Sequence, residues 1–311
     1  MGIELNDVRF LLDAHRSGVD FRNTLTIGRQ NLSVEDVYLD HLLRNYAGLP
    51  FRAAHGRFAE PLFEYLGAHD VSSIDASEYE GATIIQDLNE PIAETLCNRF
   101  SVVYEAGTLE HVFNFPVAMR NCMRMVAVGG HLLIHTPANN YFGHGFYQFS
   151  PELFYRVLRP ENGFEIERMI ALEYSIEDPF RTRWYEVADP AAVRGRVELI
   201  NGTLVLLLVR AKRVSGADPL MRTPQQSDYA EAWKSGDPAG PEAGLAGAGR
   251  GSFARRTKDW VKARVSPSLA FTVKRAKSQF RSMLSLSGWA RKVKRQRSFT
   301  NPAYFKPIPP P

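Results

Sequence analysis

"FSVVYEAGTLEHVFNFPVAMRNCMRMVAVGGHLLIHTP", residues 100–137, contains two apolar runs separated by an amphipathic segment. The runs FSVVYEAG (100–107) and GGHLLIHTP (129–137) have the length and apolar content of buried strands. Asn114 before a Phe-Pro pair is a helix start signal, and the helix that follows, VAMRNCMRMV, ends at a Gly-Gly pair. A strand, a helix and a second strand in this order are typical of a parallel sheet with helices on its faces.

The same alternation continues on both sides and predicts seven strands. They are NTLTIG (23–28), VSSID (71–75), ATIIQD (82–87), FSVVYEAG (100–107), GGHLLIHTP (129–137), GFEIERMIALEYS (163–175) and TLVLLLVRA (203–211). Asn201-Gly202 between the last two runs is a hairpin signal, so we expect the last strand to be antiparallel to its neighbour. The predicted fold class is therefore α/β, with a mostly parallel seven-stranded sheet.

Further helices are indicated by their first residues. Ser33 with Asp36 resembles a capping box and opens a helix that Gly48 closes. Ser150 with Pro151 opens the helix SPELFYRVLR. The long connection over residues 31–70 is predicted to hold two helices, the second in GRFAEPLFEYLGA.

The charge distribution divides the chain into two parts. Residues 1–210 contain 18 Lys and Arg against 28 Asp and Glu, whereas residues 211–311 contain 20 against 6. We therefore predict a folded domain over residues 1–212, a linker rich in glycine and proline over 213–252, and a basic tail over 253–311 that is largely disordered or helical.

Composition also bears on location. The longest apolar run, LVLLLV (204–209), is far shorter than the roughly 18 residues of a membrane span. Charged residues interrupt the first twenty positions, so no signal peptide is predicted. The two cysteines, Cys97 and Cys122, are too few for a disulfide framework or a metal cluster, and no metal site is predicted. These features favour the cytoplasm.

The basic tail carries an amphipathic pattern within residues 250–297. This segment holds 15 Lys and Arg with Asp259 as its single acid. Its apolar stripe and its bulky aromatic residues are Val273, Ala276, Phe280, Met283 and Leu284, with Phe253, Trp260, Phe271 and Trp289. We expect peripheral contact with an anionic membrane, placing the protein at the inner membrane face. Binding of nucleic acid or of an acidic partner, or a solvated disordered tail, are the alternatives.

The stretch over residues 102–167 resembles class I S-adenosylmethionine-dependent methyltransferases. The resemblance rests on the Leu-Glu-His-Val step after the fourth strand, on the Gly-Gly pair before the fifth, and on SSIDASEYEGATIIQDLNEPI (72–92) upstream. It covers roughly residues 20–212. It implies a three-layer Rossmann-like fold whose last strand is antiparallel, and S-adenosyl-L-methionine as cofactor.

The resemblance implies cofactor-binding roles for residues that follow the strands. Asp75 would accept both ribose hydroxyls, or else cap the next segment. Asp87 and Leu88 would read the adenine edge, with an ordinary turn aspartate as the alternative. Glu105 and Gly107 follow the fourth strand, where small residues let the backbone approach the methionine part.

Gly28 is the single glycine of a loop that is glycine-rich in these methyltransferases. Arg29 follows it, within reach of the carboxylate of the cofactor. This pared-down motif also motivates an alternative, in which the chain is a catalytically silent scaffold or binding protein with a methyltransferase fold.

Acceptor chemistry is predicted for the loops after the fourth and fifth strands. His144 would act as the general base that takes the proton of the acceptor, and His111 would orient the acceptor or the cofactor. Tyr141, Tyr147 and Gln148 are predicted to contact the substrate. For each of these residues a purely structural role is the alternative.

The function predicted from these residues is methyl transfer to a small molecule, a sugar or a lipid-linked glycan intermediate. A nucleic-acid methyltransferase is less favoured, because the acidic domain would repel phosphates. A dehydrogenase is disfavoured too, since the chain has no Gly-x-Gly-x-x-Gly.

Overall fold

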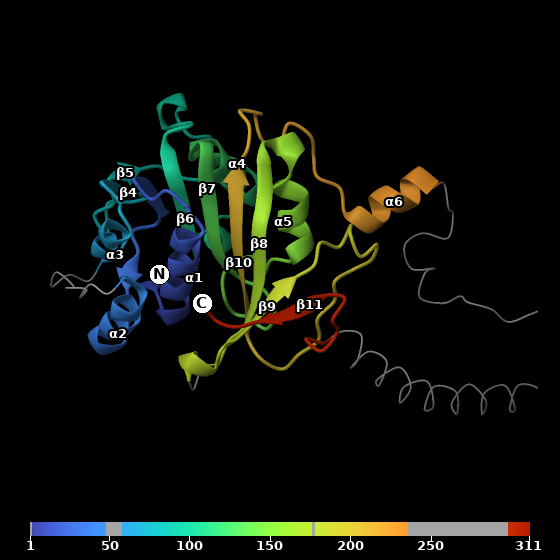
Figure 1. Ribbon diagram of the computed structural model, residues 1–311. Coiled ribbons are helices and arrows are strands. Elements are labelled where there is room, and N and C mark those ends of the chain that lie inside the picture. Colours follow the sequence, from blue (N-terminus) through green and yellow to red (C-terminus); the bar gives the residue numbers. More distant parts are fainter. Residues whose placement is uncertain (1, 48–57, 176–177, 236–297) are drawn as a thin grey trace, which may run out of the picture.

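The computed structural model describes residues 2–47, 58–175, 178–235 and 298–311 (Figure 1). The amphipathic segment predicted within residues 250–297 lies outside this range, and its membrane contact stays a prediction. In the part of the chain that is described, no helix combines the length and apolarity that a bilayer crossing requires.

Within the described residues, nine strands form one mixed sheet (Figure 1). They are β2 (Asn23–Ile27), β4 (Asp70–Asp75), β5 (Ile84–Ile85), β6 (Phe100–Ala106), β7 (Val126–Pro137), β8 (Phe164–Glu173), β9 (Arg183–Val187), β10 (Val205–Arg213) and β11 (Phe305–Ile308). Their order across the sheet is β11-β9-β8-β10-β7-β6-β2-β4-β5. A separate pair joins β1 (Gly2–Ile3) to β3 (Asn31–Leu32).

The strand directions confirm the predicted fold class. Strands β5, β4, β2, β6 and β7 run parallel to one another. Strand β10, the last of the seven predicted strands, runs antiparallel to both β7 and β8. This is the Rossmann-like arrangement that the resemblance implies, a mostly parallel sheet with an antiparallel last strand.

Helices cover both faces of the sheet. They are α1 (Leu5–Arg16), α2 (Asp36–Ala47), α3 (Glu60–Tyr65), α4 (Phe115–Met125) and α5 (Pro151–Val157). Helix α6 (Ser227–Ser235) lies beyond α5, where Glu152 accepts the Ser227 N–H (Figure 1). One hydrophobic cluster joins α1 and α3 to side chains such as Tyr104 and Leu133, and the other joins α4 and α5 to Val103 and Leu132. Neighbouring residues of a strand thus pack on opposite faces, which gives three layers.

Two local predictions are wrong. No tight hairpin forms at Asn201-Gly202, because β9 lies between β8 and β10 in the chain and pairs with the outer edge of β8. Helix α2 begins at Asp36, so Ser33 does not cap it. Asn114 does precede α4, but its amide donates to the Asn89 carbonyl and so ties this helix to the loop after β5.

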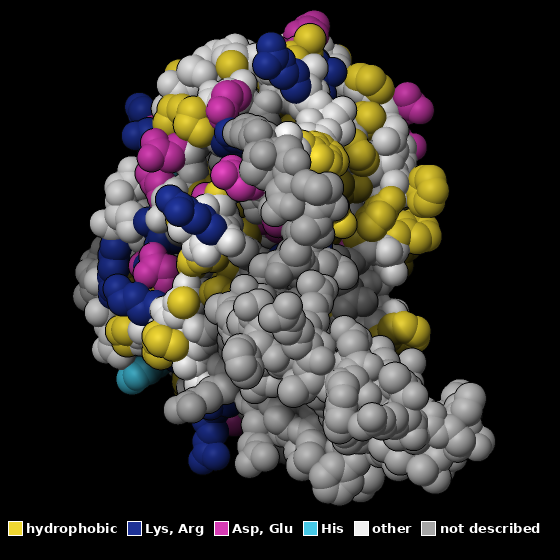
Figure 2. Space-filling model, turned by 90° about the vertical axis from the view of Figure 1, so that its right-hand side faces the viewer, with side chains coloured by type: hydrophobic (Ala, Val, Ile, Leu, Met, Phe, Trp, Pro, Cys, Tyr) yellow, Lys and Arg dark blue, Asp and Glu magenta, His cyan; other side chains and the backbone are white. Residues whose placement is uncertain are grey.

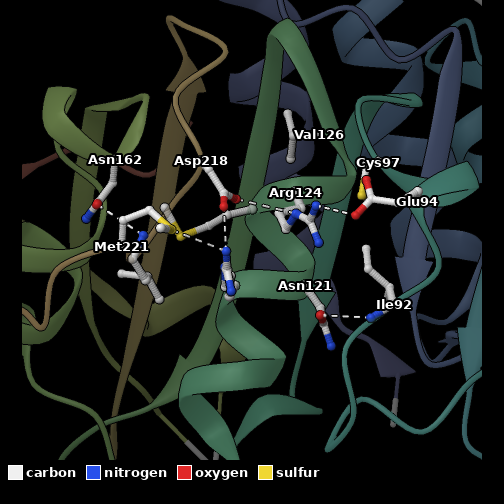
Figure 3. A network of polar contacts seen from close by, with 12 residues as sticks. Ile92, Glu94, Cys97, Asn121, Arg124, Val126, Asn162, Asp218 and Met221 are labelled. Carbon is white, nitrogen blue, oxygen red and sulfur yellow. Dashed lines mark hydrogen bonds and ion pairs between the residues drawn. The ribbon is translucent and has the colours of Figure 1, made fainter.

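The sequence on both sides of residues 236–297 packs against the sheet domain. Asp218 accepts a hydrogen bond from Arg120 Nη2 at 2.5 Å and lies 3.5 Å from Arg124 Nε (Figure 3). Strand β11 pairs antiparallel with β9, and the Phe299 ring stacks on Tyr185 at 4.1 Å between centroids. The folded unit therefore includes residues that the sequence assigned to the linker and the tail. Pro307 is tolerated because β11 is an edge strand.

Arg213, at the end of β10, closes the carboxyl end of α4. It is buried, and its Nη1 donates to the carbonyls of Met123, Arg124 and Val126. These carbonyls lie in the last turn of α4 and at its C-cap, where a helix leaves acceptors unsatisfied. One cation from the sheet thus satisfies the end of a helix on its face.

Replacing Arg213 with Met should lower the free energy of unfolding by about 2–4 kcal/mol, because the buried carbonyls lose a charged donor. Chemical denaturation of the full chain measures this. Lys212→Met, the same change at the exposed neighbouring position, should stay within about 0.5 kcal/mol of wild type. Equal effects of the two substitutions would contradict this role.

Candidate active site

The carboxyl ends of the parallel strands meet at one edge of the sheet. Ile27 of β2 lies between Ile74 of β4 and Glu105 of β6, and Ala106 is paired with His135 of β7. The chain leaves the sheet immediately beyond these positions. Ligands of open α/β sheets bind at this edge.

Two glycines form the turns after β2 and β6. Gly28 has φ +70° and Gly107 has φ +84°, in the left-handed region that favours glycine. The Gly28 N–H donates to the Ile74 carbonyl at 2.7 Å, and the Gly107 N–H to the His135 carbonyl at 3.1 Å. The hydroxyl of Thr108 donates to the Ile27 carbonyl at 3.0 Å and so connects the two turns.

The predicted ribose and adenine residues occupy different environments. Asp75 is half-buried at the end of β4, and its carboxylate makes no hydrogen bond within the described residues. Asp87 is exposed, and its Oδ1 accepts the backbone and side-chain N–H groups of Asn89, which hold the pKa of Asp87 below its usual value. Leu88 is buried, and its carbonyl accepts from Asn121. Asp75 is thus available to a ligand, whereas Asp87 already closes a turn.

Arg29 is held by protein partners. Its Nε donates to Glu60 at 2.7 Å, its Nη1 donates to the Glu80 carbonyl at 3.0 Å, and its guanidinium lies 3.8 Å from the centroid of the Phe58 ring. The side chain therefore fastens α3 to the loop after β4. Because these contacts occupy the guanidinium, Arg29 is not free to bind a cofactor carboxylate in this arrangement.

Glu105 is a buried acid at the end of β6. Its Oε1 accepts the N–H groups of Thr108 at 2.6 Å and Leu109 at 3.0 Å, whereas its Oε2 has no partner in the described residues. Burial, followed by the neighbouring Glu110, raises the pKa of Glu105 to about 8. The Glu105 carboxyl group therefore retains its proton at neutral pH.

The two predicted catalytic histidines lie together. The rings of His111 and His144 are 5.0 Å apart and nearly perpendicular, and His144 Nε2 is 3.4 Å from Glu110 Oε1. Glu110 is buried, and neither of its carboxylate oxygens accepts a hydrogen bond within the described residues. The turn η2 (Leu109–His111) supplies two of these side chains, and the loop after β7 supplies the third.

The residues predicted to contact the substrate mainly stabilise the loop after β7. Gln148 Oε1 accepts the Tyr141 N–H at 3.1 Å, and the Tyr147 hydroxyl donates to the Phe113 carbonyl at 2.6 Å. The Tyr141 ring lies 5.8 Å from that of His144, and burial raises the pKa of Tyr141. Of these three residues, Tyr141 is thus the one whose side chain lies against His144.

A buried network behind the site was not predicted. Asp7 of α1 accepts hydrogen bonds from the Tyr104 hydroxyl at 3.1 Å and the Glu4 N–H at 2.8 Å, and it pairs with His135 Nδ1. Burial alone would lower the pKa of His135, but Asp7 raises it above its usual value. Glu110 was missed as well, although it stands inside the Leu-Glu-His-Val step.

Glu105 should give the protein a characteristic pH dependence. Its pKa is 4.5 in the unfolded chain and about 8 when folded, so its contribution to stability is complete below about pH 4.5 and is lost as pH rises toward 8. Glu105→Gln keeps an acceptor for the two N–H groups but cannot ionise. Its melting temperature should therefore fall less than that of wild type between about pH 5 and 8.

Differential scanning calorimetry at several pH values measures these slopes. Glu165→Gln, at an exposed position on β8, should keep the slope of the wild-type protein. A Glu105→Gln variant with the wild-type slope would show that this carboxyl group is ionised in the fold.

Comparison with known proteins gives matches among solved structures only. No family model matches the chain, and neither does any curated protein. A possible histamine N-methyltransferase from Thermotoga maritima is 15% identical, with 66% of this chain and 91% of that chain covered and a TM-score of 0.37. The N-methyltransferase NodS from Bradyrhizobium japonicum is 13% identical, with 68% and 89% covered and a TM-score of 0.37. A putative methyltransferase from Bacillus halodurans is 12% identical, with 67% and 99% covered and a TM-score of 0.36.

Proposed function

We propose that this protein is an S-adenosylmethionine-dependent methyltransferase whose cofactor binds over the carboxyl ends of β2, β4 and β6. The observation that carries the proposal is the pair of left-handed glycines, Gly28 and Gly107, beside the Asp75 carboxylate, which makes no hydrogen bond to any described residue. The two turns present backbone without a Cβ, and a carboxylate at the end of the neighbouring strand suits a ribose diol. The residues present therefore fit this cofactor.

The surrounding charge supports the same choice. When bound, the cofactor supplies a methyl group on a positively charged sulfur. Asp75 is a half-buried acid at the edge that the cofactor would cover, and a negative potential there favours a cationic ligand over a phosphate. Leu88 and Asp87, on the loop after β5, would flank the adenine.

The acceptor would lie beside Glu110, His111 and His144. Around them stand three exposed aromatic side chains, with exposed fractions of 98% for Phe142, 71% for Phe113 and 66% for Phe146. Flat aromatic surfaces above polar groups suit a small organic or sugar acceptor, because one face of such a molecule is apolar and its edge is polar. We propose an acceptor of this class, with a lipid-linked glycan intermediate as a larger member.

The described surface gives less support to a nucleic-acid acceptor. Figure 2 shows Lys and Arg side chains mixed with Asp and Glu on the described part of one face. Backbone phosphates bind where positive charge is continuous. The basic segment 250–297 lies outside the described residues and does not enter this comparison.

Cofactor binding by the full chain tests the proposal. Calorimetric titration should show one site for S-adenosylmethionine or its demethylated product, S-adenosylhomocysteine. Asp75→Asn should weaken it roughly tenfold to 150-fold, or about 1.5–3 kcal/mol, because charged hydrogen bonds to the ribose are lost. Asp70→Asn, the same substitution at the amino end of β4, should leave the affinity unchanged.

Two results would contradict parts of the proposal. No heat with either compound would favour the silent scaffold. Tight binding that Asp75→Asn does not weaken would place the ribose elsewhere.

A further inference from the structure

Three side chains beside the proposed cofactor site have the composition of a metal centre. They are one carboxylate, Glu110, and two imidazoles, His111 and His144, and one ligand atom from each lies within 4.8 Å of the other two. We propose that these residues bind a divalent transition-metal cation such as Zn²⁺. No metal site is predicted from the sequence, because its cysteines do not form a ligand pattern.

The Glu110 carboxylate is the independent reason to place a cation here. It is 1% exposed, and within the described residues neither oxygen accepts a hydrogen bond. A buried carboxylate without compensation costs several kcal/mol. The nearby His144 approaches only Oε1, at 3.4 Å, which is longer than a charge-assisted hydrogen bond. A dication bound by Glu110 would satisfy this charge.

The distances between the ligand atoms of the three side chains suit a metal ion, and the side chains need to move little to bind it. Ligands about 2.0–2.2 Å from a tetrahedral ion are about 3.3–3.5 Å apart. The 3.4 Å between His144 Nε2 and Glu110 Oε1 already has this value. His111 is exposed, so a small rotation of its ring brings its nitrogen closer.

The backbone holds the two halves of the cluster together. The Glu110 carbonyl accepts the N–H groups of Phe146 at 2.7 Å and Tyr147 at 3.3 Å. Gly145 has φ +68°, and a Cβ there would lie 2.8 Å from that carbonyl oxygen. The loop can therefore approach this closely only with glycine beside His144. The backbone of this loop therefore determines the position of His144 over Glu110.

The chemistry of the cluster deepens the proposed function and depends on it. Three protein ligands leave coordination positions open, as in catalytic rather than structural metal sites. His111 is exposed and His144 is half exposed, so an acceptor can reach these positions. An acceptor that offers an oxygen ligand, such as a hydroxyl of a sugar or a phenol, fits them best, because the cation lowers the pKa of a bound hydroxyl.

The transfer step balances with water as the proton acceptor. The hydroxyl releases its proton to water, and its oxygen forms a bond to the methyl carbon. The carbon–sulfur bond breaks, and the sulfur keeps that electron pair and becomes a neutral thioether. In this scheme the cation lowers the pKa of the hydroxyl and water accepts the proton, so His144 serves as a ligand and not as the general base that the sequence predicted.

The test is calorimetric titration of the untagged, chelator-treated full chain with Zn²⁺, with the absorption of bound Co²⁺ as a second readout. One ion per chain should bind. Glu110→Gln keeps the shape of the side chain but removes its charge, and it should weaken binding roughly 100-fold or more, as should His144→Ala. His69→Ala, at an exposed histidine just before the amino end of β4, should bind as wild type does.

Cofactor titration of the same samples separates this proposal from the proposed function. Glu110→Gln and His144→Ala should still bind S-adenosylhomocysteine, which also shows that they are folded. Absence of zinc binding in a chain that binds S-adenosylhomocysteine would overturn the metal site alone. Zinc binding that neither substitution weakens would overturn it as well.

Discussion

The burial of three carboxylates under one edge of the sheet is the constraint on which the site depends. Asp7, Glu105 and Glu110 are each at most 1% exposed and lie at or behind the carboxyl ends of β6 and β7. A buried carboxylate must be protonated, hydrogen-bonded or paired. The three meet this requirement to different degrees. Asp7 has three partners, Glu105 has two N–H donors and retains a proton, and Glu110 accepts no hydrogen bond within the described residues.

The number of partners that stabilise each buried carboxylate therefore decreases from the interior toward the loops. The Asp7 carboxylate is fully paired and fastens α1 to β6 and β7, which makes it part of the scaffold. The remaining acceptor capacity, on Glu105 Oε2 and on both oxygens of Glu110, lies beside the loops that follow the strands. The fold is thus less stable at the place where a bound ligand would supply the missing partners, which is typical of functional sites.

The sequence predicted the features that depend on local pattern. Apolar runs identified seven of the nine strands that form the main sheet within the described residues, and glycine identified the turns at positions 28 and 107. It did not predict β9 and β11, because β11 pairs with a strand more than a hundred positions away and β9 is a five-residue segment interrupted by Arg183 and Glu186. Helix α1 was missed because Asn6 and Asp7 are buried on it, so its inner face is not uniformly apolar. The partners of Arg29, and the lack of hydrogen bonds to Glu110 within the described residues, depend on tertiary contacts that no local sequence pattern predicts.

A crystal structure of the full chain with S-adenosylhomocysteine tests the central claim most directly. The account predicts the ligand over the turns at Gly28 and Gly107, with its ribose hydroxyls on the Asp75 carboxylate. A ligand bound elsewhere, for example in the hollow between α5, β8, β9 and β11, would contradict it.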